Sequence, residues 1–88
     1  MAYITNGTIT SGGAAQDMIA DQHNYMAVVI VNSSANAMRV NVGANAGAAA
    51  GENIPAGGST TLNGLGGKRV SIYGVTTADA FSYREAIG

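Results

Sequence analysis

Short apolar runs recur along this chain, and Gly, Asn or Ser residues separate each run from the next. Apolar and polar residues alternate in several runs, with the two-residue period of a β-strand. The clearest runs are Tyr25–Asn32, Met38–Val42, Ser59–Leu62, Lys68–Tyr73 and Ala80–Ala86. Their spacing predicts an all-β fold, a small single-domain antiparallel β-sandwich or barrel of about six to eight short strands.

These runs also predict which side chains point into the core and which point to solvent. The run from Tyr25 to Asn32 is long and β-branched, which predicts a central strand buried on both faces. In the runs 38–42 and 68–73 every second residue is apolar, so the residues between them are expected to face outward. The expected inward residues are Met38, Val40, Val42, Val70 and Ile72, and the expected outward residues are Arg39, Asn41, Arg69, Ser71 and Tyr73.

The first 24 residues carry a turn signal close to the N-terminus. Asn6-Gly7 lies between two β-forming triplets, and this pair tolerates the positive φ angles of a type I′ turn, so it predicts a short hairpin. The alternative is an extended arm that adds a strand to a neighbouring subunit. The apolar spacing in 14–20 is also compatible with one helical turn. We therefore expect a hairpin or arm over residues 1–24 and a β-sandwich domain over residues 25–88.

Composition limits how the small core is stabilised. The chain has 88 residues and no Cys, so neither disulfides nor thiolate metal sites are available. A domain of this size buries only about 60 to 65% of its unfolded surface, so its stability alone is small. We therefore expect self-association, which buries further surface and stabilises the fold. Residues 43–51 are Gly, Ala and Asn, and we expect them to form a mobile surface loop.

The charge is low and balanced, with 4 Lys and Arg against 5 Asp and Glu. Nucleic-acid binding depends on clustered basic residues, and Lys68-Arg69 is the only adjacent basic pair, so we expect no nucleic-acid partner. The longest apolar stretch is far shorter than the roughly 20 residues of a membrane-spanning helix, and the N-terminus lacks the pattern of a signal peptide. These features predict a product made in the cytoplasm, without a membrane partner.

No arrangement of residues indicates catalysis. His23 is the single histidine, and the nearby acids Asp17 and Asp21 do not complete the ligand set of a typical metal site. Gly66-Gly67-Lys68 resembles a fragment of a phosphate-binding loop, but Arg69 stands where that motif needs Ser or Thr. We therefore expect no enzyme activity, no metal and no cofactor.

Four segments together resemble small virion accessory proteins of tailed bacteriophages. They are a strand that ends in Asn32, a Val-x-Val-Gly strand at 40–43, a Pro-Ala-Gly turn at 55–57 and a late Val-x-Ile-x-Gly strand at 70–74. The resemblance implies a capsid decoration or cement protein, commonly trimeric, that binds between major capsid subunits on the virion surface. It also implies the major capsid protein and further copies of this chain as partners.

Outward positions on the expected strands supply the candidate interface. They are Tyr3 and Ile4 in the N-terminal segment and Arg39, Asn41, Arg69 and Tyr73 on the strands. Tyr and Arg are common in protein interfaces. Two other functions fit the same pattern: a fibre, tail or carbohydrate-binding module in which Tyr73 and Tyr83 stack on sugars, and a head–tail structural subunit.

Overall fold

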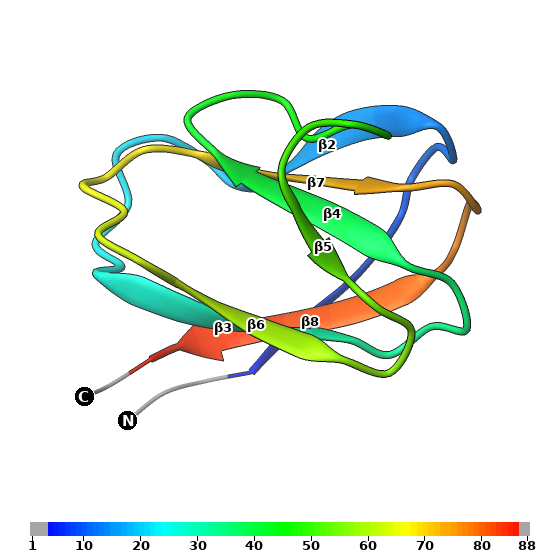
Figure 1. Ribbon diagram of the computed structural model, residues 1–88. Coiled ribbons are helices and arrows are strands. Elements are labelled where there is room, and N and C mark those ends of the chain that lie inside the picture. Colours follow the sequence, from blue (N-terminus) through cyan, green and yellow to red (C-terminus); the bar gives the residue numbers. More distant parts are fainter. Residues whose placement is uncertain (1–3, 87–88) are drawn as a thin grey trace.

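This computed structural model describes residues 4–86, which contain eight β-strands (Figure 1). They are β1 (Thr5–Thr8), β2 (Ala14–Ile19), β3 (Ala27–Asn32), β4 (Met38–Val42), β5 (Glu52–Ile54), β6 (Ser59–Asn63), β7 (Val70–Gly74) and β8 (Ala80–Glu85). The prediction of an all-β fold is confirmed.

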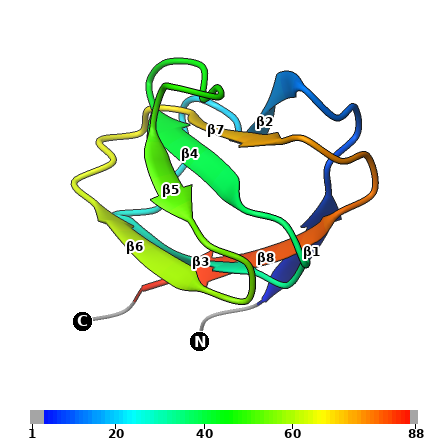
Figure 2. The ribbon, with the colours of Figure 1, turned by 45° about the vertical axis from the view of Figure 1, so that its right-hand side comes forward.

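The strands form two antiparallel four-stranded sheets that pack face to face (Figures 1 and 2). Sheet A has the order β1-β8-β3-β6, and sheet B has the order β2-β7-β4-β5. The first strand pairs with the last, the second with the last but one, and so on towards the middle of the chain. The pairs β1–β8 and β3–β6 belong to sheet A, and the pairs β2–β7 and β4–β5 belong to sheet B. The chain is therefore one long hairpin wrapped around a core, which is the arrangement of a jelly-roll sandwich.

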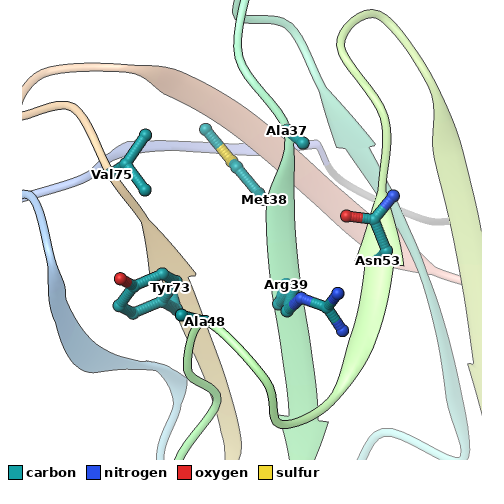
Figure 3. Close-up of a pocket in the computed structure, with 7 residues that line it drawn as sticks. All are labelled: Ala37, Met38, Arg39, Ala48, Asn53, Tyr73 and Val75. Atoms are coloured by element: carbon teal, nitrogen blue, oxygen red, sulfur yellow. The ribbon is translucent and has the colours of Figure 1, made fainter.

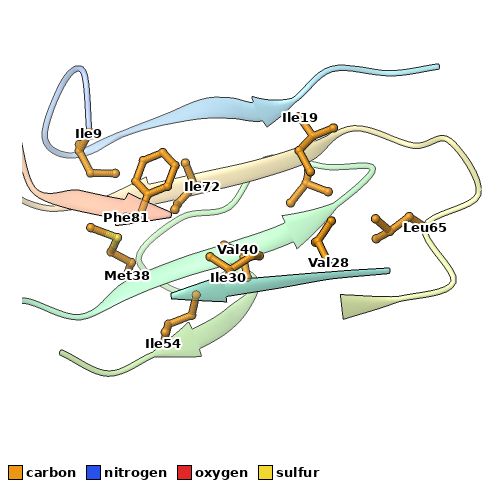
Figure 4. Close-up of a cluster of buried hydrophobic side chains, with 11 residues drawn as sticks. Ile9, Ile19, Val28, Ile30, Met38, Val40, Ile54, Leu65, Ile72 and Phe81 are labelled. Atoms are coloured by element: carbon orange, nitrogen blue, oxygen red, sulfur yellow. The ribbon is translucent and has the colours of Figure 1, made fainter. Parts of the chain in front are cut away.

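Aliphatic side chains from both sheets fill the space between the layers (Figure 4). Val28 and Ile30 from sheet A meet Val40 and Ile72 from sheet B, and all four are almost completely buried. The inward facing predicted for β4 and β7 is confirmed, because Met38, Val40, Val70 and Ile72 are buried and Val42 packs against them. The remaining members of the buried cluster are Ile9, Ile19, Ile54, Leu65 and Phe81.

The predicted core strand differs from expectation in its burial. β3 lies in the interior of sheet A between β8 and β6, as a core strand should. However, Val28 and Ile30 are buried, whereas Val29 is partly exposed and Val31 is 36% exposed. The prediction of burial on both faces is wrong, because each sheet covers only the inner face of the other.

The hairpin predicted at Asn6-Gly7 is also wrong. Both residues lie inside β1, which pairs with β8 of the same chain and places Gly7 opposite Phe81. A Cβ atom on Gly7 would lie 2.7 Å from Cζ of Phe81, so the glycine makes room for the ring instead of forming a turn. As part of β1, residues 5–8 are not an arm reaching a neighbouring subunit.

Residues 14–19 form a strand and not a helical turn. β2 pairs with β7 in sheet B, with a bulge between Asp17 and Ile19. The sandwich therefore begins at β1 and does not begin at residue 25. Its first two strands lie in different sheets, which is why they do not pair with each other.

Candidate functional site

Four of the predicted interface residues lie on or beside one surface, the outer face of sheet B. Arg39 and Asn41 belong to β4, Tyr73 belongs to β7, and Arg69 directly precedes β7. The strand register places Arg39 opposite Tyr73. The structure therefore brings these four together because their strands are neighbours in sheet B.

The other two predicted interface residues do not join this surface. Ile4 directly precedes β1 of sheet A and is 65% exposed. Tyr3 lies outside the described residues.

The loop of residues 43–51 crosses part of this outer face (Figure 2). The backbone N–H of Ala46 donates to Oγ of Ser71 on β7 at 3.1 Å, and both residues are buried. The sequence predicts a mobile surface loop at 43–51 and a Ser71 side chain that faces outward. The loop covers Ser71 instead, a contact that strand alternation alone does not reveal.

Arg69 holds the same loop through its guanidinium group. Nη1 forms an ion pair with Asp17 of β2 at 2.7 Å, and Nη2 donates to Oδ1 of Asn45 at 2.9 Å. The Asn41 side chain donates to the backbone oxygen of Asn45 at 3.3 Å. Two of the predicted interface side chains thus make contacts within the chain and fasten the loop to sheet B.

A small pocket remains open beside the loop (Figure 3). Its volume is about 160 Å³, and its lining consists of Ala37, Met38, Arg39, Ala48, Asn53, Tyr73 and Val75. Because Arg39 is the register partner of both Tyr73 and Asn53, these three side chains form a row across β7, β4 and β5. Asn53 was not singled out from the sequence, because β5 is too short to show alternation.

Arg39 is the charged residue of this pocket. Its Nη1 donates to the backbone oxygen of Gly51 at 3.0 Å. Within residues 4–86 the one ion pair joins Arg69 to Asp17, so Arg39 has no carboxylate partner there. The pocket therefore combines an amide, a phenol and a cation that has no carboxylate partner within residues 4–86 with a largely apolar wall.

A second hollow lies at the β1 edge of sheet A. It has a volume of about 420 Å³ and is lined by Asn6, Gly7, Thr8, Ser33, Ala80 and Phe81. None of these residues carries a charge. A ligand in this hollow would therefore contact backbone groups and neutral side chains and would meet no titratable side chain.

Both ring nitrogens of His23 are engaged by the backbone. Nδ1 accepts from the N–H of Tyr25 at 3.0 Å, which requires Nε2 to carry the proton that it donates to the oxygen of Lys68 at 2.6 Å. The ring thus links the segment before β3 to the segment before β7. Within residues 4–86 no three His, Asp or Glu side chains gather as metal ligands would.

Comparisons with known proteins add no relatives: no family model matches the chain, and neither a curated protein nor a solved structure does. Residues 4–86 contain no helix with the length and apolar character needed to cross a bilayer.

Proposed function

We propose that this protein is a structural component of a virus particle, which decorates and stabilises a bacteriophage capsid by binding between major capsid subunits. The observation that carries the proposal is the pairing of Arg39 with Tyr73 on the outer face of sheet B. Arg and Tyr are enriched in protein interfaces and among the residues that contribute most to binding. Here both line a pocket on a regular sheet.

The loop of residues 43–51 supports this role by keeping the surface rigid. Its contacts with Ser71, Arg69 and Asn41 hold it against sheet B. A surface that is ordered before binding loses less conformational entropy when the partner docks. Such preorganisation favours a stable contact with a large assembly over a transient one.

The architecture is compatible with the proposal and does not by itself select it. Jelly-roll sandwiches occur in viral capsid proteins and also in lectins and cupins, so the fold leaves the function to the surface. The layout of the strands in the sequence, which resembles that of phage virion accessory proteins, favours the capsid among these. The proposed partners are the major capsid protein and further copies of this chain in a homotrimer.

The test is to mix the purified protein with expanded capsids that lack it. We expect saturable uptake at a fixed number of copies per capsid, together with a rise in the melting temperature of the capsid. Absence of uptake would reject the decoration role. Binding to a glycan array without capsid uptake would support a carbohydrate-binding module instead.

A further inference from the structure

We propose that the pocket beside Arg39 receives the side chain of a glutamate from the protein partner. This inference rests on the proposed function in one respect, namely that the partner is a protein. It adds the chemistry of the contact: the carboxylate pairs with Arg39 and Asn53, and the methylene groups lie against the apolar wall.

Charge complementarity selects a carboxylate. Four acidic side chains of the chain accept hydrogen bonds elsewhere: Asp17 from the Arg69 side chain, Asp21 from the Arg69 backbone, Glu52 from Thr60 and Asp79 from Asn36. The Arg39 guanidinium keeps donors beyond the one that reaches Gly51. A carboxylate is the group that best matches such a planar donor set.

Asn53 carries an amide group on the same side of the pocket, and a turn about its terminal bond would present the NH2 group as a second donor. Figure 3 shows the Arg39 guanidinium extending from β4 towards β5, where the Asn53 amide lies. A carboxylate has two oxygens and can accept from both groups at once. The Tyr73 ring borders the pocket on the opposite side, from β7.

The apolar wall decides what carries the carboxylate. Ala37, Ala48 and Val75 line the pocket and offer no polar side-chain group, and the side chain of the fourth lining residue, Met38, is buried in the core. Sugar hydroxyls buried against these residues would lose their hydrogen bonds to water without replacement, which is costly, whereas methylene groups gain from the contact. A volume of about 160 Å³ is also below the roughly 300 to 1,000 Å³ of typical small-molecule sites, so it suits one side chain.

The pocket can be tested without any capsid. The probe is glutamate blocked at both ends as N-acetyl-glutamate amide, titrated into isotope-labelled protein and followed by amide chemical shifts. We expect saturable shifts at Arg39, Ala48, Asn53 and Tyr73. Blocked glutamine, which has the same shape without the charge, should bind about tenfold more weakly or worse.

Variants separate the pocket from general charge effects. Arg39→Gln should weaken binding of blocked glutamate about tenfold, and Asn53→Ala should weaken it less, because it removes a neutral donor. Arg84→Gln is the matched control, since it removes one positive charge from β8 of the other sheet. Asn53→Ala leaves the contacts of the 43–51 loop intact, so it keeps the test valid if Arg39→Gln disturbs that loop.

Several outcomes would overturn the inference. They are equal binding of blocked glutamine, shifts confined to residues outside the pocket, equal loss in Arg84→Gln, and binding of glucuronate in place of blocked glutamate. Capsid uptake distinguishes this inference from the proposed function. Glutamate binding without capsid uptake rejects the decoration role alone, whereas capsid uptake that is unchanged by both Arg39→Gln and Asn53→Ala rejects the glutamate contact alone.

Discussion

At the end of β3, the side chain of Asn32 is fully buried and its hydrogen-bonding groups are satisfied by loops from two parts of the chain. Its amide nitrogen lies within hydrogen-bond distance of the backbone oxygens of Asn36, Ile54 and Pro55, which share its two N–H donors. Its amide oxygen accepts from the backbone and hydroxyl of Ser34. A single polar residue therefore ties the β3–β4 turn to the end of β5.

Replacing Asn32 with Ala should lower the free energy of unfolding by about 2 to 4 kcal/mol, because it leaves several buried backbone groups without partners. Urea unfolding followed by circular dichroism measures the change. Asn63→Ala is the control, since Asn63 is exposed at the end of β6, and it should change stability by less than about 0.5 kcal/mol. Equal effects of the two substitutions would contradict the role assigned to Asn32.

Gly7 matters for a different reason, the space that its missing side chain leaves for Phe81. Gly7→Ala should cost about 1 to 3 kcal/mol, because the new Cβ atom would force the ring or β1 to move. Thermal unfolding measures the cost. Adding Phe81→Leu should make the double variant less destabilised than the sum of the two single changes. Strict additivity would show that the two residues do not compete for space.

At the scale of elements, the pattern of apolar and polar residues located the four inner strands of the two sheets and the edge strand β6. β3, β4, β6, β7 and β8 fall within about two residues of the predicted runs. β2 was read as a possible helical turn, because Ala15, Met18 and Ile19 also fit a helical spacing, and its pairing with β7 decides in favour of the strand. β5 has three residues, too few for any periodic signal.

One of the contacts that hold the 43–51 loop to sheet B is the buried hydrogen bond from the Ala46 N–H to Ser71. Ser71→Ala removes the acceptor of the buried Ala46 N–H, so amide exchange at Ala46 should become about tenfold faster. Hydrogen exchange followed by NMR measures this. Ser59→Ala, at an exposed position of β6, is the control and should leave the Ala46 rate unchanged. Unchanged exchange in Ser71→Ala would show that Arg69 and Asn41 suffice to hold the loop.

At the scale of the whole molecule, the two sheets bury one face each and leave two outer faces. The outer face of sheet B is partly covered by the 43–51 loop and carries the Arg39 pocket. On the outer face of sheet A, Val31 is 36% exposed among the described residues. A chain this small gains stability when such surfaces are buried by other subunits.

We therefore predict self-association, with a trimer favoured. Light scattering coupled to size-exclusion chromatography at micromolar concentration should give about three times the chain mass of 8.8 kDa. The melting temperature should rise with protein concentration, because only the folded chains associate. A mass of one chain at every concentration, with a constant melting temperature, would contradict this prediction.

The sequence by itself determined the fold class, the position of most strands and the inward facing of β4 and β7, because these depend on local alternation of apolar and polar residues. It also placed Arg39 and Tyr73 on an outer face. The tertiary structure decided which of the outward side chains remain free to contact a partner. Arg69 and Asn41 bind the 43–51 loop, and Arg39 faces Asn53 across β4 and β5. Those contacts join residues that are distant along the chain, so no local pattern could reveal them.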